Sequence, residues 1–314
     1  MYTAPPRESK MEIPVRYFPT PMDISVIVPV YNSEVWLEGC IQALLKQTYS
    51  EGRCEYILVD NGSTDGSAAI MRHYPAVRLL SETKRGAYAA RNRGLQEARG
   101  EIIAFTDSDC VPRSDWLEQI VRIMRDPGVD IVLGQRKFPP GSHTMQLLAE
   151  YDDVKESYIL SVGARELYYA SAANMAVRKS LMDAVGPFPE IRRGGDTIFV
   201  KRAVNRYGRG ILRYSPDVQV IKLEMTNAWK WWQKMLVYGR SYQNYRRIVA
   251  SRSLSNGQRL EVIRRLAATN KLSVLDCAKL CLVLTVGLLH WHAGRLSGIL
   301  AARDQVLARP SSER

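Results

Sequence analysis

The sequence has few of the residues and motifs on which several large protein classes depend. Its 314 residues include five cysteines, none in a CxxC pair, which argues against a disulfide framework and favours free thiols in a reducing compartment. The four histidines have no HExxH or paired zinc spacing, so we expect structural or surface histidines and no zinc site. Neither a G-x-x-x-x-G-K-[ST] nor a G-x-G-x-x-G motif is present, which argues against a P-loop ATPase and a dinucleotide-dependent enzyme.

Long apolar runs are also missing. Residues 1–21 contain five prolines and no apolar run, so we expect a flexible lead-in without a secretory signal, and a cytoplasmic protein. The most apolar stretch, 280–294, has 15 residues and includes His290 and His292, whereas crossing a bilayer takes about 20 residues. We therefore expect a helix that lies on the inner face of a membrane, with a buried core or oligomer helix as the alternative.

Positive charge is concentrated at one end of the chain. The net charge is +12, and residues 227–314 carry 15 Lys/Arg against 4 Asp/Glu, or +11. The same segment begins with the aromatic and basic runs WKWW (229–232) and YGRSYQNYRR (238–247). Such a surface suits anionic lipid, a phosphorylated substrate or nucleic acid, and it equally suits packing of a basic helix against a catalytic domain.

Strands and helices alternate in the first third of the chain. Apolar, β-branched runs at 23–30, 55–60, 77–80 and 102–105 predict strands. The intervening segments predict helices that end near residues 45, 73 and 98, the first of them capped by Ser33. Short connections between alternating strands and helices predict an α/β fold with a mainly parallel sheet and helices on both faces.

The segment EIIAFTDSDCVP (101–112) contains the clearest candidate site. Its apolar run predicts a buried strand that Pro112 should end, and ligands of open α/β sheets bind at the carboxyl ends of strands. Asp107 and Asp109 would therefore face a ligand. Paired carboxylates suit Mg²⁺ or Mn²⁺ bound together with phosphates, which predicts a metal–diphosphate site.

Four segments, taken in order and spacing, resemble the family 2 glycosyltransferases. They are ISVIVPVYN (24–32), VDNGSTDGS (59–67), ARNRG (90–94) and FTDSD (105–109), and the resemblance extends over residues 23–225. It implies a GT-A type, Rossmann-like fold and the transfer of a sugar from a nucleotide diphosphate sugar, with inversion at the anomeric carbon.

The resemblance also implies roles for individual residues on the donor side. Asp60 would accept a hydrogen bond from the base, which Tyr31 would stack on, although Asp60 also suits an Asx turn and Tyr31 suits a half-buried loop. Asp107 would lie near the ribose, and Asp109 would hold the metal. The donor-binding set that it implies is Pro29, Tyr31, Glu34, Asp60, Arg85, Arg91, Asp107, Ser108 and Asn174.

The acceptor side includes the general base that the resemblance implies. Within RGGDTIF (193–199), Asp196 would remove the proton of the acceptor hydroxyl, or serve as a helix N-cap. Asn174 would bind a sugar hydroxyl or act as a buried turn amide. Two residues depart from the family pattern: Gly195 replaces the usual Glu, and Lys222 lies where many relatives have a metal-binding His.

These predictions combine into one interpretation of the chain. We expect a lead-in (1–21), a GT-A domain (22–226) made of a nucleotide-binding half (22–112) and an acceptor half (113–226), and a basic helical region (227–314). The expected activity is transfer to a glycan or lipid-linked acceptor in cell-surface polysaccharide or glycolipid synthesis, with no nucleic acid as partner. The alternatives are a sugar nucleotidyltransferase and a non-catalytic module that binds nucleotide sugars or nucleic acid.

Overall fold

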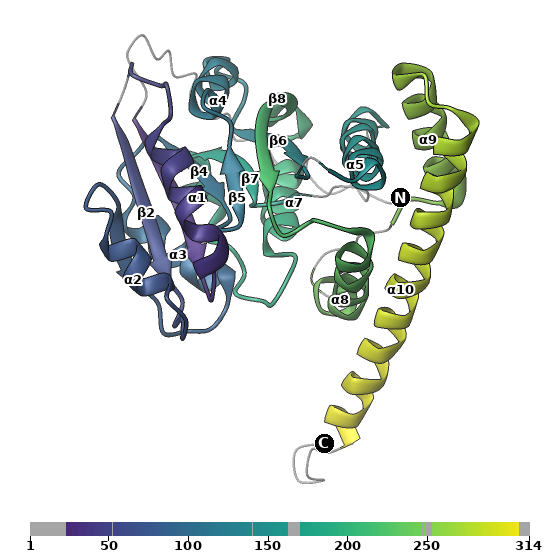
Figure 1. Cartoon of the computed structure of the whole chain (residues 1–314). Helices are drawn as coiled ribbons and strands as arrows, with labels where there is room; N and C mark the ends of the chain where they lie inside the picture. The colour runs from purple at the N-terminus through teal and green to yellow at the C-terminus, as the bar shows by residue number, and fades with distance from the viewer. Residues whose placement is uncertain are drawn as a thin grey trace, which may run out of the picture.

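An eight-stranded sheet, with the order β3-β2-β1-β4-β7-β6-β8-β5, forms the centre of the molecule (Figure 1). The computed structural model describes residues 23–307 except 52, 140, 163–169, 247 and 249–252. The predicted lead-in, and Tyr168 and Tyr169 before the predicted acceptor-side strand, lie outside the described residues. In chain order the strands are β1 (Ile24–Val30), β2 (Cys54–Asp60), β3 (Arg78–Ser81), β4 (Ile102–Thr106), β5 (Cys110–Pro112), β6 (Ile131–Lys137), β7 (Asn174–Arg178) and β8 (Leu212–Lys222).

The helices lie close to the positions that the apolar pattern predicts in the first third of the chain. They are α1 (Glu34–Leu45), α2 (Ser67–Arg72), α3 (Ala87–Glu97), α4 (Trp116–Met124), α5 (His143–Val162), α6 (Lys179–Val185), α7 (Gly195–Tyr207), α8 (Ala228–Arg246), α9 (Asn256–Asn270) and α10 (Val274–Leu307). Ser33 occupies the N-cap position of α1 as predicted, but its side chain does not cap the helix; it hydrogen-bonds the Tyr31 carbonyl and the Ser108 hydroxyl instead.

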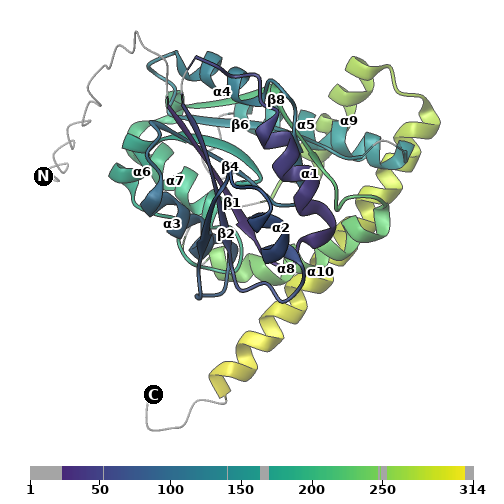
Figure 2. The same cartoon turned by 60° about the vertical axis from the view of Figure 1, so that its left-hand side comes forward.

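The two faces of the sheet are covered by different helices (Figure 2). On β1, Val26 and Val28 pack into a core with α1, α2 and α4, whereas Ile27 packs with α3, α6 and α7 on the other face. This alternation follows from the period of two along a strand. The sheet is mixed: β3, β2, β1 and β4 are parallel, and β7 runs antiparallel to both β4 and β6.

Pro112 is the last residue of a strand, as predicted, but of a second, short strand and not of the one that the apolar run 102–105 forms. It belongs to β5, which pairs antiparallel with β8 so that Pro112 lies opposite Val220. Because β5 is the last strand of the sheet, its other edge has no strand that would need the missing N–H of the proline.

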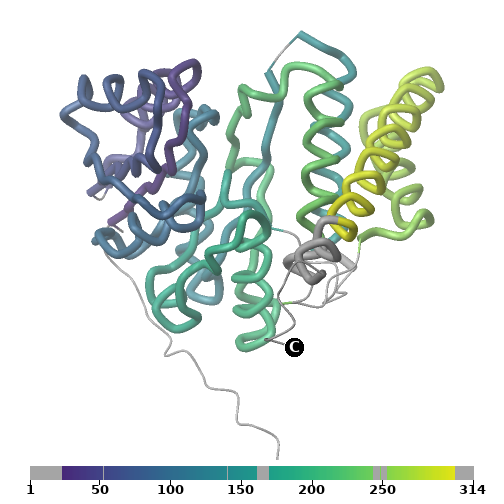
Figure 3. Tube along the Cα trace, turned by 90° about the horizontal axis from the view of Figure 1, so that it is seen from below, coloured from purple at the N-terminus to yellow at the C-terminus, as the bar shows by residue number. Residues whose placement is uncertain are grey.

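The last third of the chain packs beside the sheet layer (Figure 1). A third hydrophobic cluster joins residues of α5 and α8 to Val262 and Leu266 of α9 and Leu280 of α10. Figure 3, seen from below, shows α8 and α5 between the sheet and the α9–α10 pair. The helix α10 has 34 residues, so the apolar stretch predicted at 280–294 is only its central part.

Candidate active site

A cavity of about 1160 Å³ opens where β1 and β4 end and α7 begins. Its wall combines residues from segments far apart in the sequence. Eight of the eleven residues predicted for the site line it: Pro29, Tyr31, Arg85, Arg91, Asp107, Ser108, Asp109 and Asp196.

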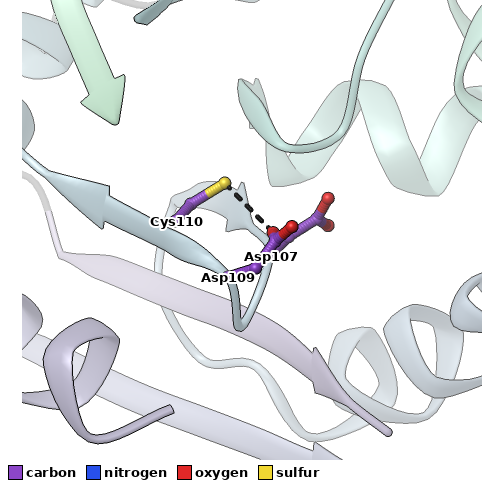
Figure 4. A group of neighbouring side chains, drawn as sticks. All are labelled: Asp107, Asp109 and Cys110. Carbon is purple, nitrogen blue, oxygen red and sulfur yellow. Dashed lines mark hydrogen bonds between the residues drawn. The ribbon is translucent and has the colours of Figure 1, made fainter. Parts of the chain in front are cut away.

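Asp107 and Asp109 follow β4 directly, as the sequence predicts. Together with Cys110 they form a group whose oxygen and sulfur atoms lie within 4.8 Å of one another (Figure 4). The Cys110 thiol lies 3.5 Å from Asp109 Oδ1, and burial raises its pKa far above the usual range. Two hard carboxylates and a protonated thiol make this group a candidate cation site, with the carboxylates as the ligands.

The same two carboxylates already hold a cation of the chain. Lys222 Nζ lies 2.8 Å from Asp109 Oδ1 and 3.2 Å from Asp107 Oδ2. Arg91 pairs with the other oxygen, Oδ1, of Asp107. Burial alone would raise the pKa of Asp107, but the charges of Lys222 and Arg91 outweigh it and hold this pKa well below its usual range. Asp107 is therefore ionised at any physiological pH.

Lys222 itself keeps its charge in this buried place. Burial alone would lower its pKa, but the negative charges of Asp107 and Asp109 outweigh that effect and raise the pKa well above the usual value. The next ammonium group, on Lys234, pairs with Glu224. Burial, and then the nearby charge of Lys222, lower the pKa of Lys234.

Asp196 lies in the first turn of α7, where the helix dipole favours a carboxylate. It is not the N-cap, because Gly194 holds that position with φ +86°. Both carboxylate oxygens are oriented: Oδ2 accepts the Ala172 N–H at 3.0 Å, and Oδ1 accepts the Thr197 N–H at 2.8 Å.

Tyr88 connects Asp196 to the Asp107 side of the cavity. Its ring centroid lies 5.3 Å from the Arg91 guanidinium carbon. Burial, and then the charge of Asp196, raise the pKa of its hydroxyl well above the usual value. The same ring explains Gly195, since a Cβ there would lie 2.8 Å from the Pro189 carbonyl oxygen and 3.0 Å from Tyr88. The glutamate that the family resemblance implies at this position does not fit here without a shift.

Comparison with known proteins identifies the family of this chain. The model "Glycosyl transferase family 2" matches residues 25–186, about half of the chain. The chain belongs to glycosyl transferase family 2. Among curated relatives, the glycosyltransferase AglE of Haloferax volcanii is 35% identical over 190 residues, which cover 58% of this chain and 61% of AglE. The poly(ribitol-phosphate) beta-glucosyltransferase of Bacillus spizizenii is 32% identical over 161 residues, 48% of this chain and 25% of that protein.

The aligned part of this family 2 chain thus spans about 60% or less of the length of these relatives. Among solved structures, the mannosyltransferase PcManGT of Pyrobaculum calidifontis, in complex with GDP-Man and Mn²⁺, superposes with a TM-score of 0.58 and 23% identity. The match covers 92% of this chain and 91% of PcManGT. It confirms the predicted GT-A type fold, including a helical C-terminal region.

Tyr31, which follows β1, and Arg85 contact each other in the cavity wall. The sequence left open whether Tyr31 stacks on a base or is a half-buried loop residue. The Arg85 guanidinium carbon lies 4.9 Å from the centroid of the Tyr31 ring, which is 52% exposed. An arginine therefore lies over one face of the ring on which a base was predicted to stack. Arg85 does not reach Asp107; it hydrogen-bonds the Gly62 carbonyl at 3.2 Å, whereas Arg91 is the residue that orients Asp107.

Two predicted donor residues, Glu34 and Asp60, are not among the residues that line the cavity. Glu34 accepts the N–H of Gly66 and so holds the 61–66 loop against α1. Asp60 accepts the N–H of Ser63 at 3.1 Å, which is the turn role that its sequence left open. The cavity wall includes Asn61 instead.

Asn174 is in the wrong place for its predicted contact with a sugar hydroxyl. It is 1% exposed, and its amide nitrogen donates to the carbonyls of Gln135 and Val218, each at 2.8 Å. Its amide oxygen accepts the Trp116 indole N–H at 2.8 Å. An amide engaged on both sides and sealed from solvent joins β6, β7, β8 and α4, and it has no free group for a ligand.

The sequence did not indicate that the cavity extends to the C-terminal helices. Met235 on α8 and Leu288 and Trp291 on α10 line its far end. The aromatic and basic composition of the α8 segment indicated a surface that makes contacts. It did not show whether these contacts are with the rest of the protein or with a ligand.

Proposed function

We propose that this protein is an inverting glycosyltransferase that moves a sugar from a nucleotide diphosphate sugar to an acceptor hydroxyl. One observation carries the proposal: Asp107 and Asp109 at the end of β4 and Asp196 at the start of α7 line a single cavity. Inverting transfer needs a site for the leaving diphosphate and a base for the incoming hydroxyl in the same space.

Asp196 is the proposed general base. Its two backbone hydrogen bonds, to Ala172 and Thr197, hold the carboxylate in one orientation without using all of its lone pairs. It takes the acceptor proton while the acceptor oxygen attacks the anomeric carbon from the side opposite the diphosphate, so the bond to the leaving oxygen breaks as the new bond forms. Tyr88 and Gly195 position it by close packing.

Positive charge at the donor end stabilises the departing diphosphate. Arg91 and Lys222 reach this end of the cavity, and fixed charges placed where negative charge develops lower the barrier. We include Mg²⁺ or Mn²⁺ as the proposed divalent cofactor, which would act as a Lewis acid on the diphosphate. Asp109, with Asp107, would hold it once Lys222 has moved off these oxygens. The solved complex of PcManGT with GDP-Man and Mn²⁺ supports this choice of donor class and metal.

A lipid-linked acceptor is the proposed second substrate. The cavity runs from Asp196 to apolar side chains of α8 and α10, and a substrate with a polar head and an apolar tail fits this change in polarity. The proposed location is the surface of an anionic membrane. The segment Val274–Leu300 of α10 is long and apolar enough to cross a membrane by length and composition. The 15-residue stretch 280–294 therefore underestimates the length of the apolar segment. Lys279 and Arg295 interrupt the apolar run without ending the helix.

The test is release of nucleoside diphosphate from a panel of nucleotide sugars, with Mg²⁺, with Mn²⁺ and with EDTA, water replacing the acceptor. We expect release from one donor by the wild-type protein. Asp196→Asn should slow it by about 10²- to 10⁴-fold, the usual contribution of a general base, while calorimetry shows donor binding retained. The exposed control Asp183→Asn should leave both unchanged. Absence of both release and donor binding for every nucleotide sugar would overturn the proposal.

A further inference from the structure

Lys222 reaches the carboxylate pair because the sheet places it there. The strands β5 and β8 pair antiparallel with Cys110 opposite Lys222. The next residue, Leu223, donates its N–H to the Asp109 carbonyl at 2.8 Å. Backbone pairing fixes the position from which the Lys222 side chain extends, and this side chain is only 11% exposed, so its ammonium group stays close to the carboxylates, unlike that of a surface lysine with many rotamers.

The charges at this point are already balanced. Two carboxylates, Asp107 and Asp109, face two cationic groups, Lys222 and Arg91. A divalent cation binds carboxylate oxygens at about 2.0–2.2 Å and needs their negative charge. Here Asp109 Oδ1 and Asp107 Oδ2 both accept hydrogen bonds from one ammonium group. An ion on these oxygens would lie within a few ångströms of the Lys222 charge, where repulsion is strong in a buried site.

The remaining neighbours do not offset that repulsion. Cys110 presents a protonated thiol to Asp109, and a thiol is a poor ligand for a hard cation. Lys234 adds another positive charge close by, and its partner Glu224 compensates for it. The carboxylates therefore fit a divalent cation only when Lys222 has left them.

We infer that Lys222 is a built-in counter-ion that competes with divalent metal for Asp107 and Asp109. The protein without donor binds Mg²⁺ and Mn²⁺ weakly, and the affinity rises when residue 222 carries no charge. A diphosphate offers Lys222 alternative oxygens, so donor binding frees the carboxylates and favours metal binding. This last step rests on the proposed function, whereas the competition itself does not.

The experiment measures Mn²⁺ binding to the donor-free protein by electron paramagnetic resonance of the free ion, which needs no catalysis. We expect Lys222→Met to bind Mn²⁺ at least tenfold more tightly than the wild type. The double variant Lys222→Met/Asp109→Asn should lose this gain, and the exposed-lysine control Lys46→Met should match the wild type. Lys222→Gln provides a second uncharged variant, and thermal melting confirms that each variant is folded.

Two results would overturn the inference. One is a wild-type protein that binds Mn²⁺ as tightly as Lys222→Met and Lys222→Gln. The other is tight binding that persists in Lys222→Met/Asp109→Asn, because the ion would then lie elsewhere. Absence of both nucleoside diphosphate release and donor binding would overturn the proposed function and leave the metal result standing, so the two failures are distinguishable.

Discussion

Asp153 on α5 is a carboxylate that the structure buries without full compensation. Its Oδ1 atom has no hydrogen-bond partner among the described residues. Burial raises the pKa of Asp153 to about 6, and the charge of Glu156 adds to the rise. The folded state therefore binds this proton more tightly than the unfolded chain, whose Asp has the ordinary pKa of 3.8. The stabilising contribution is complete below pH 3.8 and is lost as the pH rises towards 6.

Asp153→Asn should accordingly stabilise the protein at neutral pH and not in acid. Because the site is partly solvated, we expect a gain of only about 1 kcal/mol at pH 7.5, or a rise in Tm of about 2 °C. The gain should vanish near pH 4, where the wild-type carboxyl is also neutral. Thermal unfolding of both proteins from pH 4 to 8 measures this. A gain that is the same at every pH, or one shared by Asp183→Asn, would contradict the explanation.

At the scale of elements, α8 and α10 pack through glycines. A Cβ at Gly294 would lie 2.0 Å from the Leu236 carbonyl oxygen, and a Cβ at Gly239 would lie 1.9 Å from that of Trp291. Contact this close brings two helix backbones together and leaves no space for any side chain. The path of α10, which lines the far end of the cavity, therefore depends on these positions.

Gly294→Ala should destabilise the α8–α10 packing, although alanine is the better helix former. The new methyl group must push the backbones apart, which costs about 1–3 kcal/mol. The matched control is Gly257→Ala on α9, where a Cβ meets nothing within 4 Å, and there we expect no loss of stability. Thermal unfolding and the rate of proteolysis within 228–307 measure both variants. Equal behaviour of the two would contradict a close backbone contact between α8 and α10 at Gly294.

At the scale of the whole molecule, α10 leaves a long apolar face uncovered. Leu282, Leu289 and Leu296 recur every seven residues and are 65%, 64% and 62% exposed. The C-terminal part of the helix projects beyond the rest of the molecule (Figures 1 and 2). The basic segment 227–314 carries the charge that an anionic surface attracts.

Replacing these three leucines with glutamine should weaken binding to vesicles of anionic lipid at least tenfold, because each leucine side chain gains about 1.5 kcal/mol or more when buried. Co-sedimentation measures the effect, and added salt should weaken wild-type binding through screening. Leu260→Gln, an exposed leucine on α9, is the control. The opposite outcome is a wild-type protein that does not bind vesicles but dimerises, with the dimer lost in the triple variant. The apolar face would then bind a second copy of the chain.

Short-range patterns in the sequence were sufficient for one part of this molecule. Continuous apolar, β-branched runs predicted the first four parallel strands, and the segments between them predicted the helices, since each of these patterns is local in the chain. The motif after β4 placed Asp107 and Asp109 at a strand end, and the resemblance to family 2 placed Asp196 near a helix start. These features depend on neighbours within a few residues along the chain.

Only the tertiary structure decided which side chains meet. Lys222 reaches Asp109 through the antiparallel register of β5 and β8, and no local pattern encodes a pairing between segments so far apart. The Asn174 side chain makes three hydrogen bonds to the surrounding strands and helix. It donates to backbone carbonyls of β6 and β8 and accepts the indole N–H of Trp116 on α4. The 15-residue apolar run became part of a 34-residue helix, because packing against α8 stabilises a helix that continues past its charged residues. These contacts depend on strand register and packing between segments far apart in the chain, so residue types and their spacing were not sufficient to predict them.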